Sequence, residues 1–501
     1  DFVACHKEAY IQDYDIVGEI KDGGIFLLNC SWSVDDLDKH LKASVKRQIA
    51  QKHISFYIID ATKIAMEIGL GNRTNTVLQA AFFKLANIIP IDDAVKYMKD
   101  AIVKTYSAKG EKIVNMNCEA VERGVSGVVE VKVPAAWADA KDEAVADTGK
   151  DLPDFVKKIC VPSNLQKGDD LPVSEFLPYA NGDYPIGSAA YEKRGIAVNV
   201  PVWNVTKCVQ CNQCSMVCPH AAIRPYLLDE AEVKAAPEGF VTKKAVGKGL
   251  ENYQFRIQVS PLDCYSCGTC IKTCPVQALD YEPLDTQRKE AANWDYAQTL
   301  SFKDTGLDKF SVKGSQFNKP YLEFSGACAG CAETPYCKVV TQLFGDRMMI
   351  ANATGCSCVW ADSVPSTPYT TNKDGRGPAW GNSLFEDNAE YGLGMYLGVH
   401  QVREKLAMDV WEAIQHADLS EADKAVLQDW YDHRDDTEGT RDRADKATAV
   451  AAAKDHDAVC QRIYDRRDYL VKRSQWLFGG DGWAYDIGYG GLDHVLAQDE
   501  D

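Results

Sequence analysis

The sequence has neither an excess of positive charge nor a long apolar run. Its 501 residues carry a net charge of −18, which argues against a nucleic-acid-binding protein, because such proteins usually present a basic face. Uncharged apolar stretches stay shorter than the roughly 18 residues that a membrane helix needs, so no membrane span is expected. The opening residues, DFVACHKEAY, lack the basic segment and the cleavage site of a secretory signal. Because they begin with Asp1 rather than Met, we expect the chain to be an internal piece of a longer protein.

Length and cysteine content set the broad class. A chain of 501 residues is too long for one ordinary domain, and about 150 residues per domain predicts three or four. The apolar content of 46% is ordinary for a globular protein. Eighteen cysteines are many for a chain without a secretory signal, and most lie in CxxC-type groups. This pattern favours thiolate metal ligands in a reducing compartment over a disulfide scaffold.

Residues 1–133 alternate between strand-like and helix-like segments. Short apolar runs predict strands at 23–32 and 54–61, and SGVVEVKV predicts another at 126–133. Amphipathic segments predict helices, which span 34–51, 74–89 and 91–106. Alternation of this kind predicts an α/β domain with a mostly parallel sheet.

The rest of the chain divides by composition into four further parts, so the predicted fold class is a multidomain α/β protein. Residues 134–203 are rich in Pro and Gly and predict a linker and extended arm. Residues 204–284 hold eight cysteines and predict a ferredoxin-like α+β domain, and residues 285–320 are polar and aperiodic, as in a connector. An α/β pattern returns in 321–501 with a polar helical insertion near 416–475, in which RDRADKATAVAAAKDHDAV predicts a solvated helix.

The strongest motif is a repeated cysteine run, KCVQCNQCSMVCP and DCYSCGTCIKTCP. Both copies follow CxxCxxCxxxCP, the spacing of two-cluster bacterial ferredoxins. Three cysteines on a tight loop can reach three irons of one cubane, while the fourth begins the next turn and faces the neighbouring cubane. The spacing therefore predicts two [4Fe-4S] clusters, one held by Cys208, Cys211, Cys214 and Cys274, the other by Cys264, Cys267, Cys270 and Cys218.

The alternatives for this module are zinc and unrelated structural thiols. Zinc usually takes four ligands as two CxxC pairs, often with His, which fits a repeated four-cysteine run less well. The segment between the repeats, from about Tyr226 to Gln258, is longer than a minimal ferredoxin needs and is expected to be a surface excursion.

A third group of cysteines lies downstream. Cys328, Cys331 and Cys337 fall in PYLEFSGACAGCAETPYCKVV, and Cys356 and Cys358 follow in ANATGCSCVW. A CxxC pair with a third cysteine about 25 residues on can hold three corners of another cubane. A structural zinc site or inert buried thiols remain alternatives from the spacing alone.

Several segments resemble one family over essentially the whole chain. FSGACAGCAETPY, NATGCSCVWADSVPSTPYTTN, GRGPAWGNSLFEDNAEYGLGM and GDGWAYDIGYGGLDHVLA are similar to pyruvate:ferredoxin (flavodoxin) oxidoreductases. The segment DFVACHKEAY with IDATKIAMEIGLGNRTNTVLQAAFFKL resembles the coenzyme-A-binding domain of that family, and YEKRGIAVNVPVW resembles the arm before its ferredoxin domain. The resemblance identifies 321–501 as the first part of a thiamine-diphosphate-binding domain.

The resemblance also implies site residues. Cys328, Cys331 and Cys356 match three ligands of a proximal [4Fe-4S] cluster whose fourth ligand lies beyond this chain, which leaves Cys337 and Cys358 as extra thiols. Glu333 and Cys356 match positions that line the thiamine site. The resemblance further implies that Asn75 and Asn117 contact coenzyme A.

Given this resemblance, the Gly-Asp-Gly near the end of the sequence is interpreted as part of the thiamine diphosphate site. Thiamine diphosphate binds through Mg²⁺, which takes oxygen ligands at about 2.0–2.1 Å. A carboxylate at a strand-to-helix turn suits that ion, and flanking glycines let the backbone approach the phosphates. Asp481 is therefore the expected Mg²⁺ ligand, with Gly480, Gly482 and Trp483 lining the diphosphate and ring. For an isolated motif, the alternative is an ordinary Asp-Gly turn.

The implied reaction is oxidative decarboxylation of pyruvate with coenzyme A to acetyl-CoA and CO₂. Electrons would pass through three [4Fe-4S] clusters to ferredoxin or flavodoxin, in the cytoplasm or a hydrogenosome-type organelle of an anaerobe. The resemblance implies a homodimer for the full-length protein, and the net negative charge argues against a nucleic-acid partner. No residue of this chain is identified as certainly catalytic, and by itself the chain is expected to show no pyruvate oxidation. The alternatives are an oxidoreductase for another 2-oxoacid and a non-catalytic iron–sulfur electron-transfer subunit.

Overall fold

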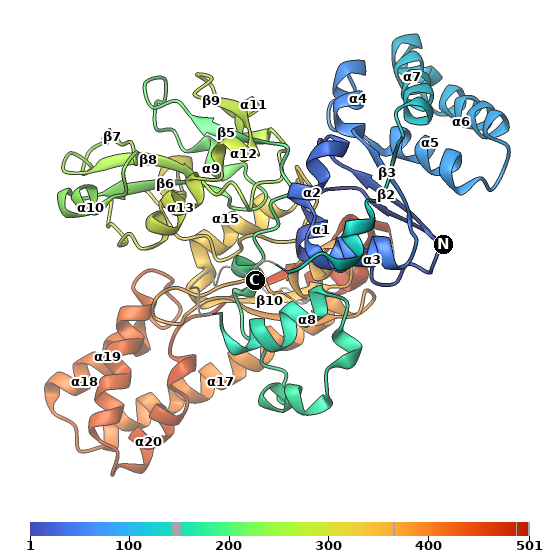
Figure 1. The fold of residues 1–501 in the computed structure, drawn as a ribbon. Helices are drawn as coiled ribbons and strands as arrows, with labels where there is room; N and C mark the ends of the chain where they lie inside the picture. The colour runs from blue at the N-terminus through green and yellow to red at the C-terminus, as the bar shows by residue number, and fades with distance from the viewer. Residues whose placement is uncertain (143–151, 364–365, 487, 499–501) are drawn as a thin grey trace. The chain divides into compact units, whose positions relative to one another are not determined.

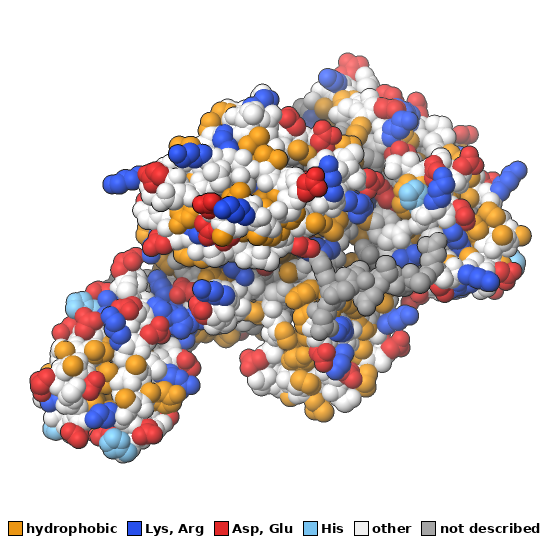
Figure 2. Space-filling model, turned by 60° about the vertical axis from the view of Figure 1, so that its left-hand side comes forward, with side chains coloured by type: hydrophobic (Ala, Val, Ile, Leu, Met, Phe, Trp, Pro, Cys, Tyr) orange, Lys and Arg blue, Asp and Glu red, His pale blue; other side chains and the backbone are white. Residues whose placement is uncertain are grey.

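The computed structural model describes residues 1–142, 152–363, 366–486 and 488–498. The chain forms two compact units, Asp1–Pro178 and Tyr179–Asp501, and Figure 1 shows their elements. Figure 2 shows acidic and basic side chains interspersed over the visible face. No helix in the described part of the chain combines the length and the apolar character that a bilayer crossing needs.

The first unit is an α/β domain built on a four-stranded sheet. The strands are β1 (Phe2–Cys5), β2 (Ile25–Asn29), β3 (Ser55–Ile59) and β4 (Val129–Val131), in the order β1-β2-β3-β4. β1, β2 and β3 are parallel and β4 is antiparallel to β3. The mostly parallel sheet that the sequence predicts is therefore confirmed.

Helices cover both faces of this sheet because successive strand residues point to opposite sides. Phe26 and Leu28 of β2 pack with α2 (Leu37–His40) and α3 (Ala43–Gln51), whereas Leu27 packs with the helices of the other face. The other face carries α4 (Ala61–Ile68), α5 (Asn75–Ala86) and α7 (Glu111–Ser126), with α6 (Ile91–Tyr106) packed outside α5 and α7. The predicted helix at 34–51 is in fact broken, since Leu41 and Lys42 adopt extended backbone between α2 and α3.

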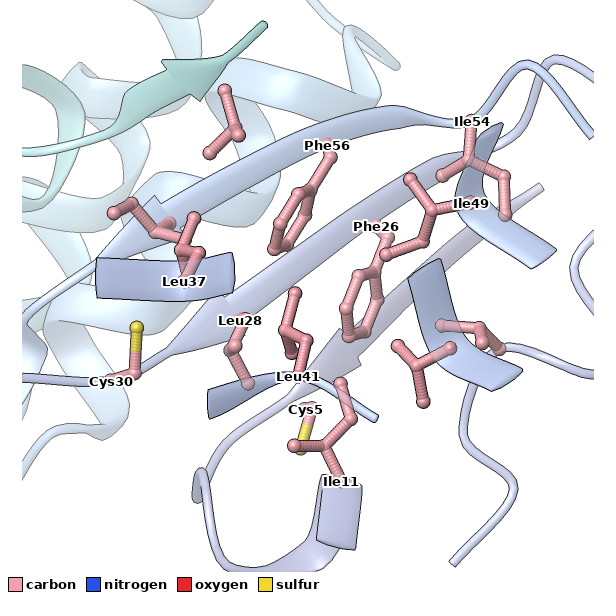
Figure 3. Packing of buried hydrophobic residues seen from close by; sticks show 14 of the residues in the cluster. Cys5, Ile11, Phe26, Leu28, Cys30, Leu37, Leu41, Ile49, Ile54 and Phe56 are labelled. Atoms are coloured by element: carbon pink, nitrogen blue, oxygen red, sulfur yellow. The ribbon is translucent and has the colours of Figure 1, made fainter. Parts of the chain in front are cut away.

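The core on the α2–α3 face centres on two stacked rings (Figure 3). Phe26 and Phe56 lie 5.4 Å apart between ring centroids, and both are buried. Trp137 closes this core from the predicted arm, and its indole N–H donates to Asp38 at 2.8 Å. The arm is therefore packed on the sheet at this point rather than extended. The predicted arm residues 143–151 lie outside the described part.

Phe56→Ala is expected to destabilise the first unit by about 3–5 kcal/mol, because it removes a buried aromatic ring and leaves a cavity. Hydrogen–deuterium exchange of the β2 and β3 peptides should then become faster. Val129→Ala is the control, since Val129 lies on β4 of the same sheet with 47% of its surface exposed and should change stability by less than about 0.5 kcal/mol. Equal exchange in both variants would contradict the assignment of Phe56 to the core.

The second unit begins with the ferredoxin-like part. β5 (Asn199–Trp203) pairs antiparallel with β9 (Leu279–Pro283), and β6 (Ile223–Leu228), β8 (Gln254–Val259) and β7 (Lys243–Lys244) form an antiparallel sheet in the order β6-β8-β7. Short helices α9 (Gln213–Met216) and α11 (Thr269–Thr273) each contain the third cysteine of a repeat. The expectation of a surface excursion between the repeats is wrong in part, because Leu228 of β6, Phe255 of β8 and Leu250 between β7 and β8 are fully buried core residues.

The segment expected to be a connector contributes to the core as well. It contains α12 (Leu284–Gln287), α13 (Glu290–Gln298) and α14 (Val312–Ser315). Trp294 of α13 is buried and packs with Ala189 and Phe324.

α10 (Glu230–Ala235), between β6 and β7, starts with a capping box formed by Asp229 and Glu232, which satisfies two otherwise unpaired backbone amides.

The last part of the second unit is a three-stranded parallel sheet with helices. β10 (Met348–Ala353) lies between β11 (Ala379–Ser383) and β12 (Ser474–Phe478). α15 (Thr334–Phe344) precedes β10, and α16 (Cys356–Cys358) follows it directly. α21 (Leu492–Leu496) lies near the end of the described chain.

The predicted helical insertion forms a bundle of its own at the end of a long helix (Figure 1). α17 (Asn388–His416) leads from the sheet to α18 (Glu421–Asp432), α19 (Thr440–Ala453) and α20 (Ala458–Asp465). The interpretation of 441–459 as one solvated helix is wrong, since Ala447 and Ala451 of α19 are buried in the bundle core and the helix ends before α20 starts. Small alanines let α19 approach Leu427 and Trp430 of α18 closely.

Candidate functional site

The two cysteine repeats fold into matching loops. Each loop uses left-handed backbone at three equivalent positions, which allow a tight turn around a common centre. The matched pairs are Gln210 and Ser266, Asn212 and Gly268, and Ala221 and Gln277, with φ between 49° and 75°. The backbone thus repeats as closely as the cysteine spacing does.

Each cavity beside these loops is lined by four cysteines. The first cavity is lined by Cys208, Cys211, Cys214 and Cys274, with apolar walls that include Val209, Ile257 and Leu279. The second is lined by Cys218, Cys264, Cys267 and Cys270, with Ile223, Val259 and Tyr281. The structure brings together the same two sets of four that the spacing predicts, with the fourth cysteine exchanged between repeats. Their role as cluster ligands stays a prediction.

The surroundings of these thiols suit a metal cluster. Burial, with added repulsion between neighbouring thiolates, raises the pKa of Cys214 to about 12 and that of Cys264 to about 12. Grouped thiolates in an apolar cavity therefore need positive charge to offset them, and cluster iron supplies it. No three His, Cys, Asp or Glu side chains of the described residues converge on a single-ion position. A cubane does not require such convergence, because each thiolate binds a different iron.

Backbone amides point at several of the sulfurs. Gln210 N–H and Ser266 N–H donate to Cys208 Sγ and Cys264 Sγ, each at 3.4 Å, in equivalent places of the two loops. Ala278 N–H donates to Cys274 Sγ at 3.2 Å. Hydrogen bonds of this kind stabilise thiolates and tune the reduction potential of a bound cluster.

A buried lysine joins the cysteine loops to α15. Lys338 Nζ donates to the main-chain oxygens of Met216 at 3.1 Å and Cys218 at 3.0 Å, and burial lowers its pKa to about 8. Nothing in the sequence motif singles out this residue.

The third cysteine group lies against the second cavity. A Cβ placed on Gly330, inside the Cys328–Cys331 loop, would lie 3.5 Å from Cβ of Cys267. Cys331 packs against the apolar cluster of β10, and Cys356 begins α16 directly after that strand. Cys328 and Cys356 are exposed, whereas Cys331 is half-buried.

The two extra thiols are core residues. Cys337 and Cys358 are each 6% exposed. Burial raises the pKa of Cys337 to about 12, and Cys358 Sγ lies 3.1 Å from both the N and the O of Gly355. Their surroundings are those of inert structural thiols.

Asp481 and Cys356 lie at the same edge of the parallel sheet. Cys356 follows the carboxyl end of β10, and Asp481 follows that of its neighbour β12, at the predicted strand-to-helix turn. Ligands of open α/β sheets bind at this edge. Thr354 Oγ1 donates to the main-chain oxygen of Ser383 at 3.0 Å, which closes the β10–β11 side of the edge.

Glu333 belongs to this same region. Burial raises the pKa of the Glu333 carboxyl, and the negative charge of Asp481 raises it further. A carboxyl whose charged form is disfavoured by a neighbouring carboxylate marks a place where a divalent cation is stabilising. The structure therefore brings Glu333 and Asp481 together.

The glycines of the turn divide into open and closed positions. A Cβ on Gly480 would meet nothing within 4 Å, so space beside Asp481 is open, and one on Gly482 would lie 3.2 Å from the Phe385 ring. Gly479, which the motif does not include, is required because a Cβ there would overlap the Trp483 ring at 2.2 Å. Trp483 itself is 3% exposed and packs with Ala353 and Ala389. It therefore supports the turn from the core and does not face solvent.

These residues fit Mg²⁺ and a diphosphate in part. Asp481 supplies one exposed carboxylate oxygen donor beside open space, and Glu333 adds negative charge. Mg²⁺ prefers six oxygen ligands, and this chain's turn offers one of them, with phosphate oxygens and water as the natural remainder.

The two asparagines predicted to contact coenzyme A lie in the first unit. Asn75 is exposed at the start of α5. Asn117 is 8% exposed, donates to the Ile113 oxygen at 2.9 Å and accepts from Thr76 Oγ1 at 3.4 Å. The Asn117 amide is thus engaged in joining α7 to α5, and only Asn75 is open to a ligand.

A cavity of about 490 Å³ lies elsewhere in the first unit, at the carboxyl ends of β2 and β3. It is lined by Trp32, Asp60, Lys63, Glu67 and Arg123, among others. The sequence reading did not single it out, although Asp60 directly follows the predicted strand. Its position and size are those of a ligand site in an open sheet.

Comparison with family models gives three matches along the chain. Residues 1–127 match pyruvate ferredoxin/flavodoxin oxidoreductase, residues 141–197 match EKR, a domain of unknown function, and residues 207–278 match the 4Fe-4S dicluster domain. The last match and the eighteen cysteines support iron–sulfur clusters.

Curated relatives match nearly the whole chain. Pyruvate:ferredoxin oxidoreductase of Moorella thermoacetica is 54% identical over 99% of this chain, and pyruvate-flavodoxin oxidoreductase of Enterobacter agglomerans is 52% identical over 100% of it, with 43% of each relative covered. Pyruvate dehydrogenase [NADP(+)] of Euglena gracilis is 45% identical over 99% of the chain and 28% of its own length.

Among solved structures, pyruvate oxidoreductase subunit PORC of Thermotoga maritima matches 26% of this chain and 65% of its own. Its identity is 20% and its TM-score 0.22, which is too low to establish a common fold. The chain spans less than half the length of the first two relatives. Over nearly all of its own length, the chain is a homologue of the pyruvate:ferredoxin and pyruvate-flavodoxin oxidoreductases.

Proposed function

We propose that this chain provides the electron-transfer core and part of the thiamine site of an enzyme that oxidises pyruvate with coenzyme A and reduces ferredoxin or flavodoxin. The observation that carries the proposal is that three cysteine groups lie next to one another in space within one unit. Two sets of four line adjacent cavities, and the third group lies against the second set and near the turn of Asp481. A chain of redox centres that ends beside a candidate substrate site is what such an enzyme needs.

At the sheet edge, Asp481 would hold Mg²⁺, and the open space at Gly480 would admit a diphosphate. When bound, thiamine diphosphate supplies the electron sink that lets CO₂ leave a 2-oxoacid. Glu333 lies at the same place, where its negative charge would add to that of Asp481 in attracting the ion. Trp483 fixes the turn through its buried contacts with Gly479.

The electron route follows the order of the cysteine groups. Cys328, Cys331 and Cys356 would hold the cluster nearest the thiamine site, and the loop of Gly330 brings it against Cys267 of the second cavity. The two cavities lie near each other, since the charge of Cys214 in the first contributes to raising the pKa of Cys270 in the second. Clusters bound in them would therefore be close neighbours. The cluster held by Cys208, Cys211, Cys214 and Cys274 would then pass electrons to the external acceptor.

Coenzyme A would approach the first unit. Asn75 is open to it, and the cavity at the carboxyl ends of β2 and β3 offers Lys63 for a phosphate group, while Arg123 in the same cavity is paired with Glu67. Cations at such a sheet edge are suited to anionic ligands.

Anaerobically purified full-length protein tests the proposal. It should contain about twelve Fe per polypeptide, as expected of three [4Fe-4S] clusters. It should also form acetyl-CoA and reduce ferredoxin or flavodoxin only when pyruvate and coenzyme A are both present. About eight Fe would contradict the third cluster, while full iron without activity on any 2-oxoacid would favour a non-catalytic electron-transfer subunit.

The same assay separates the neighbouring activities. Relatives named pyruvate dehydrogenase [NADP(+)] share 44–45% identity with this chain, so NADP⁺ is the second acceptor to test. Faster turnover of another 2-oxoacid than of pyruvate would assign a different substrate to the same machinery.

A further inference from the structure

Three consecutive charged residues, Glu192, Lys193 and Arg194, lie in the segment that matches a domain of unknown function. Such a run is ordinarily a solvated surface. Here the side chains of Glu192 and Arg194 are only 9% and 14% exposed, and they form an ion pair with each other. Their burial calls for a structural reason, because buried charges are costly unless they are well paired.

Lys193 binds the segment that leads into the second cysteine repeat. Its Nζ lies 2.6 Å from Asp263 Oδ2, and the Asp263 side chain is 3% exposed and directly precedes Cys264. The same Nζ lies 4.6 Å from the centre of the Phe324 ring, a cation–π distance. Gly195 adds a backbone bond, from its N–H to the oxygen of Leu262 at 2.9 Å.

Arg194 joins that loop to the third cysteine group. Its NH1 donates to Tyr265 Oη at 2.8 Å and to the main-chain oxygen of Phe324 at 3.1 Å. Tyr265 follows Cys264, and Phe324 lies shortly before Cys328. One guanidinium therefore holds loops from both cysteine groups.

A buried histidine adds a parallel link. The His220 ring stacks on Tyr265 at 3.8 Å, and its Nδ1 lies 3.1 Å from the Ser325 oxygen. The Phe324 N–H donates to the His220 oxygen at 3.0 Å. His220 lies two residues after Cys218. Its contacts with Phe324 and Ser325 therefore join a loop of the second cavity to the segment before Cys328.

Glu192 reaches the segment after Cys356. Its carboxylate accepts from Ser366 Oγ. The backbone nearby is also fastened, since Ser188 Oγ accepts from Thr367 N–H at 2.8 Å and Ala189 N–H donates to the Thr367 oxygen at 3.2 Å. The three side chains thus contact three segments: one directly before Cys264, one shortly before Cys328, and one that begins ten residues after Cys356.

We propose that Glu192, Lys193 and Arg194 form a clamp that fixes the separation between the third cluster and the cluster of the second cavity, and thereby sets the rate of electron transfer between them. The proposal rests on the proposed function, which supplies the third cluster. In the step concerned, one electron leaves the reduced third cluster and reduces the cluster held by Cys218, Cys264, Cys267 and Cys270, with no bond made or broken. The three residues act by positioning and touch no substrate.

The test uses anaerobic full-length protein with Arg194→Gln, Lys193→Met or Ser366→Ala. The control is Arg288→Gln, which removes an exposed arginine paired with Asp285 at 2.8 Å in the same unit. Iron content, EPR spin–spin coupling between reduced clusters and the rate of cluster reduction by pyruvate are measured for each. The coupling reports distance and orientation, so it separates a clamp from a simple loss of positive charge near the clusters.

Arg194→Gln and Lys193→Met should keep the iron of the wild type, weaken the coupling and slow reduction of the second-cavity cluster by roughly tenfold or more, since misplacement of about 1 Å can cost up to about a hundredfold at other reacting centres. Ser366→Ala, which removes one hydroxyl and should fold normally, should show a smaller change in the same direction. Wild-type coupling and rate in all three variants would overturn the clamp. A wild-type protein with only about eight Fe would instead remove the third cluster, and with it the proposed function.

Discussion

Asp481→Ala in the full-length protein is expected to lower pyruvate-dependent reduction of ferredoxin by more than about a hundredfold, since even an outer-shell partner of a metal site is worth 10–100-fold. The reason is geometric. Asp481 is the exposed carboxylate of the turn after β12, with open space beside Gly480 and the charge of Glu333 nearby. Without it, Mg²⁺ would lose a protein ligand and thiamine diphosphate its anchor.

The cluster signals separate this effect from unfolding. Asp481 lies on the parallel-sheet part of the unit, outside both four-cysteine cavities. The EPR spectra of the two ferredoxin-type clusters, after chemical reduction, should therefore match those of the wild type. Bound thiamine diphosphate, measured after gel filtration, should fall in parallel with activity.

Asp493→Ala is the matched control, because Asp493 is an exposed carboxylate on α21 near the same end of the chain. It should leave thiamine diphosphate content and turnover unchanged. If Asp481→Ala turned over pyruvate at the wild-type rate, the Gly-Asp-Gly segment would be an ordinary turn.

Local patterns in the first unit predicted its fold well. The apolar runs around Phe26 and Phe56 correspond to β2 and β3, and the amphipathic segment 91–106 corresponds to α6. These elements obey short-range periodicity, which a sequence displays directly. The edge strand β1 was not predicted, because Phe2–Cys5 is too short to establish a period.

Errors occurred where packing partners are distant or side chains are small. Alanines on α19 carry little hydrophobic signal, so Ala447 and Ala451 gave no sign that Trp430 would cover them. Leu228 and Phe255 are separated along the chain but lie on the paired strands β6 and β8, and a long segment between motifs was therefore misjudged as surface. Tertiary contacts decided these positions, not local propensity.

The candidate site shows the same difference between features set by local sequence and features set by contacts between distant residues. The cysteine spacing predicted both sets of four because it encodes loop geometry. The contacts of Arg194 could not be predicted, since its partners Tyr265 and Phe324 lie 71 and 130 residues further along the chain. The engaged amide of Asn117 was also invisible, as it depends on Thr76 in another helix.

The exchange of the fourth cysteine between repeats gives the second large prediction. Cys218 belongs to the first repeat in sequence but lines the cavity of Cys264, Cys267 and Cys270. Cys214 lies within the one-turn helix α9, and the chain that leaves this helix carries Cys218 to the neighbouring cavity. Removing Cys218 together with Cys264 should therefore damage one cluster, whereas removing it together with Cys208 should damage two.

Paired substitutions make this difference measurable in anaerobic full-length protein. Cys218→Ala with Cys264→Ala should retain the EPR signal of the first-cavity cluster and lose about four Fe, as expected for one cubane. Cys218→Ala with Cys208→Ala should lose both ferredoxin-type signals and about eight Fe. Both should abolish ferredoxin reduction, because each interrupts the electron route.

Cys460→Ala serves as the control, since Cys460 is a fully buried thiol of the α17–α20 bundle and lines neither cavity. It should retain every cluster signal and full turnover. If the two paired variants exchanged their results, each cluster would be held by one repeat alone. The assignment of one cluster to each cavity would then be wrong, and so would the proposed electron route through Cys267.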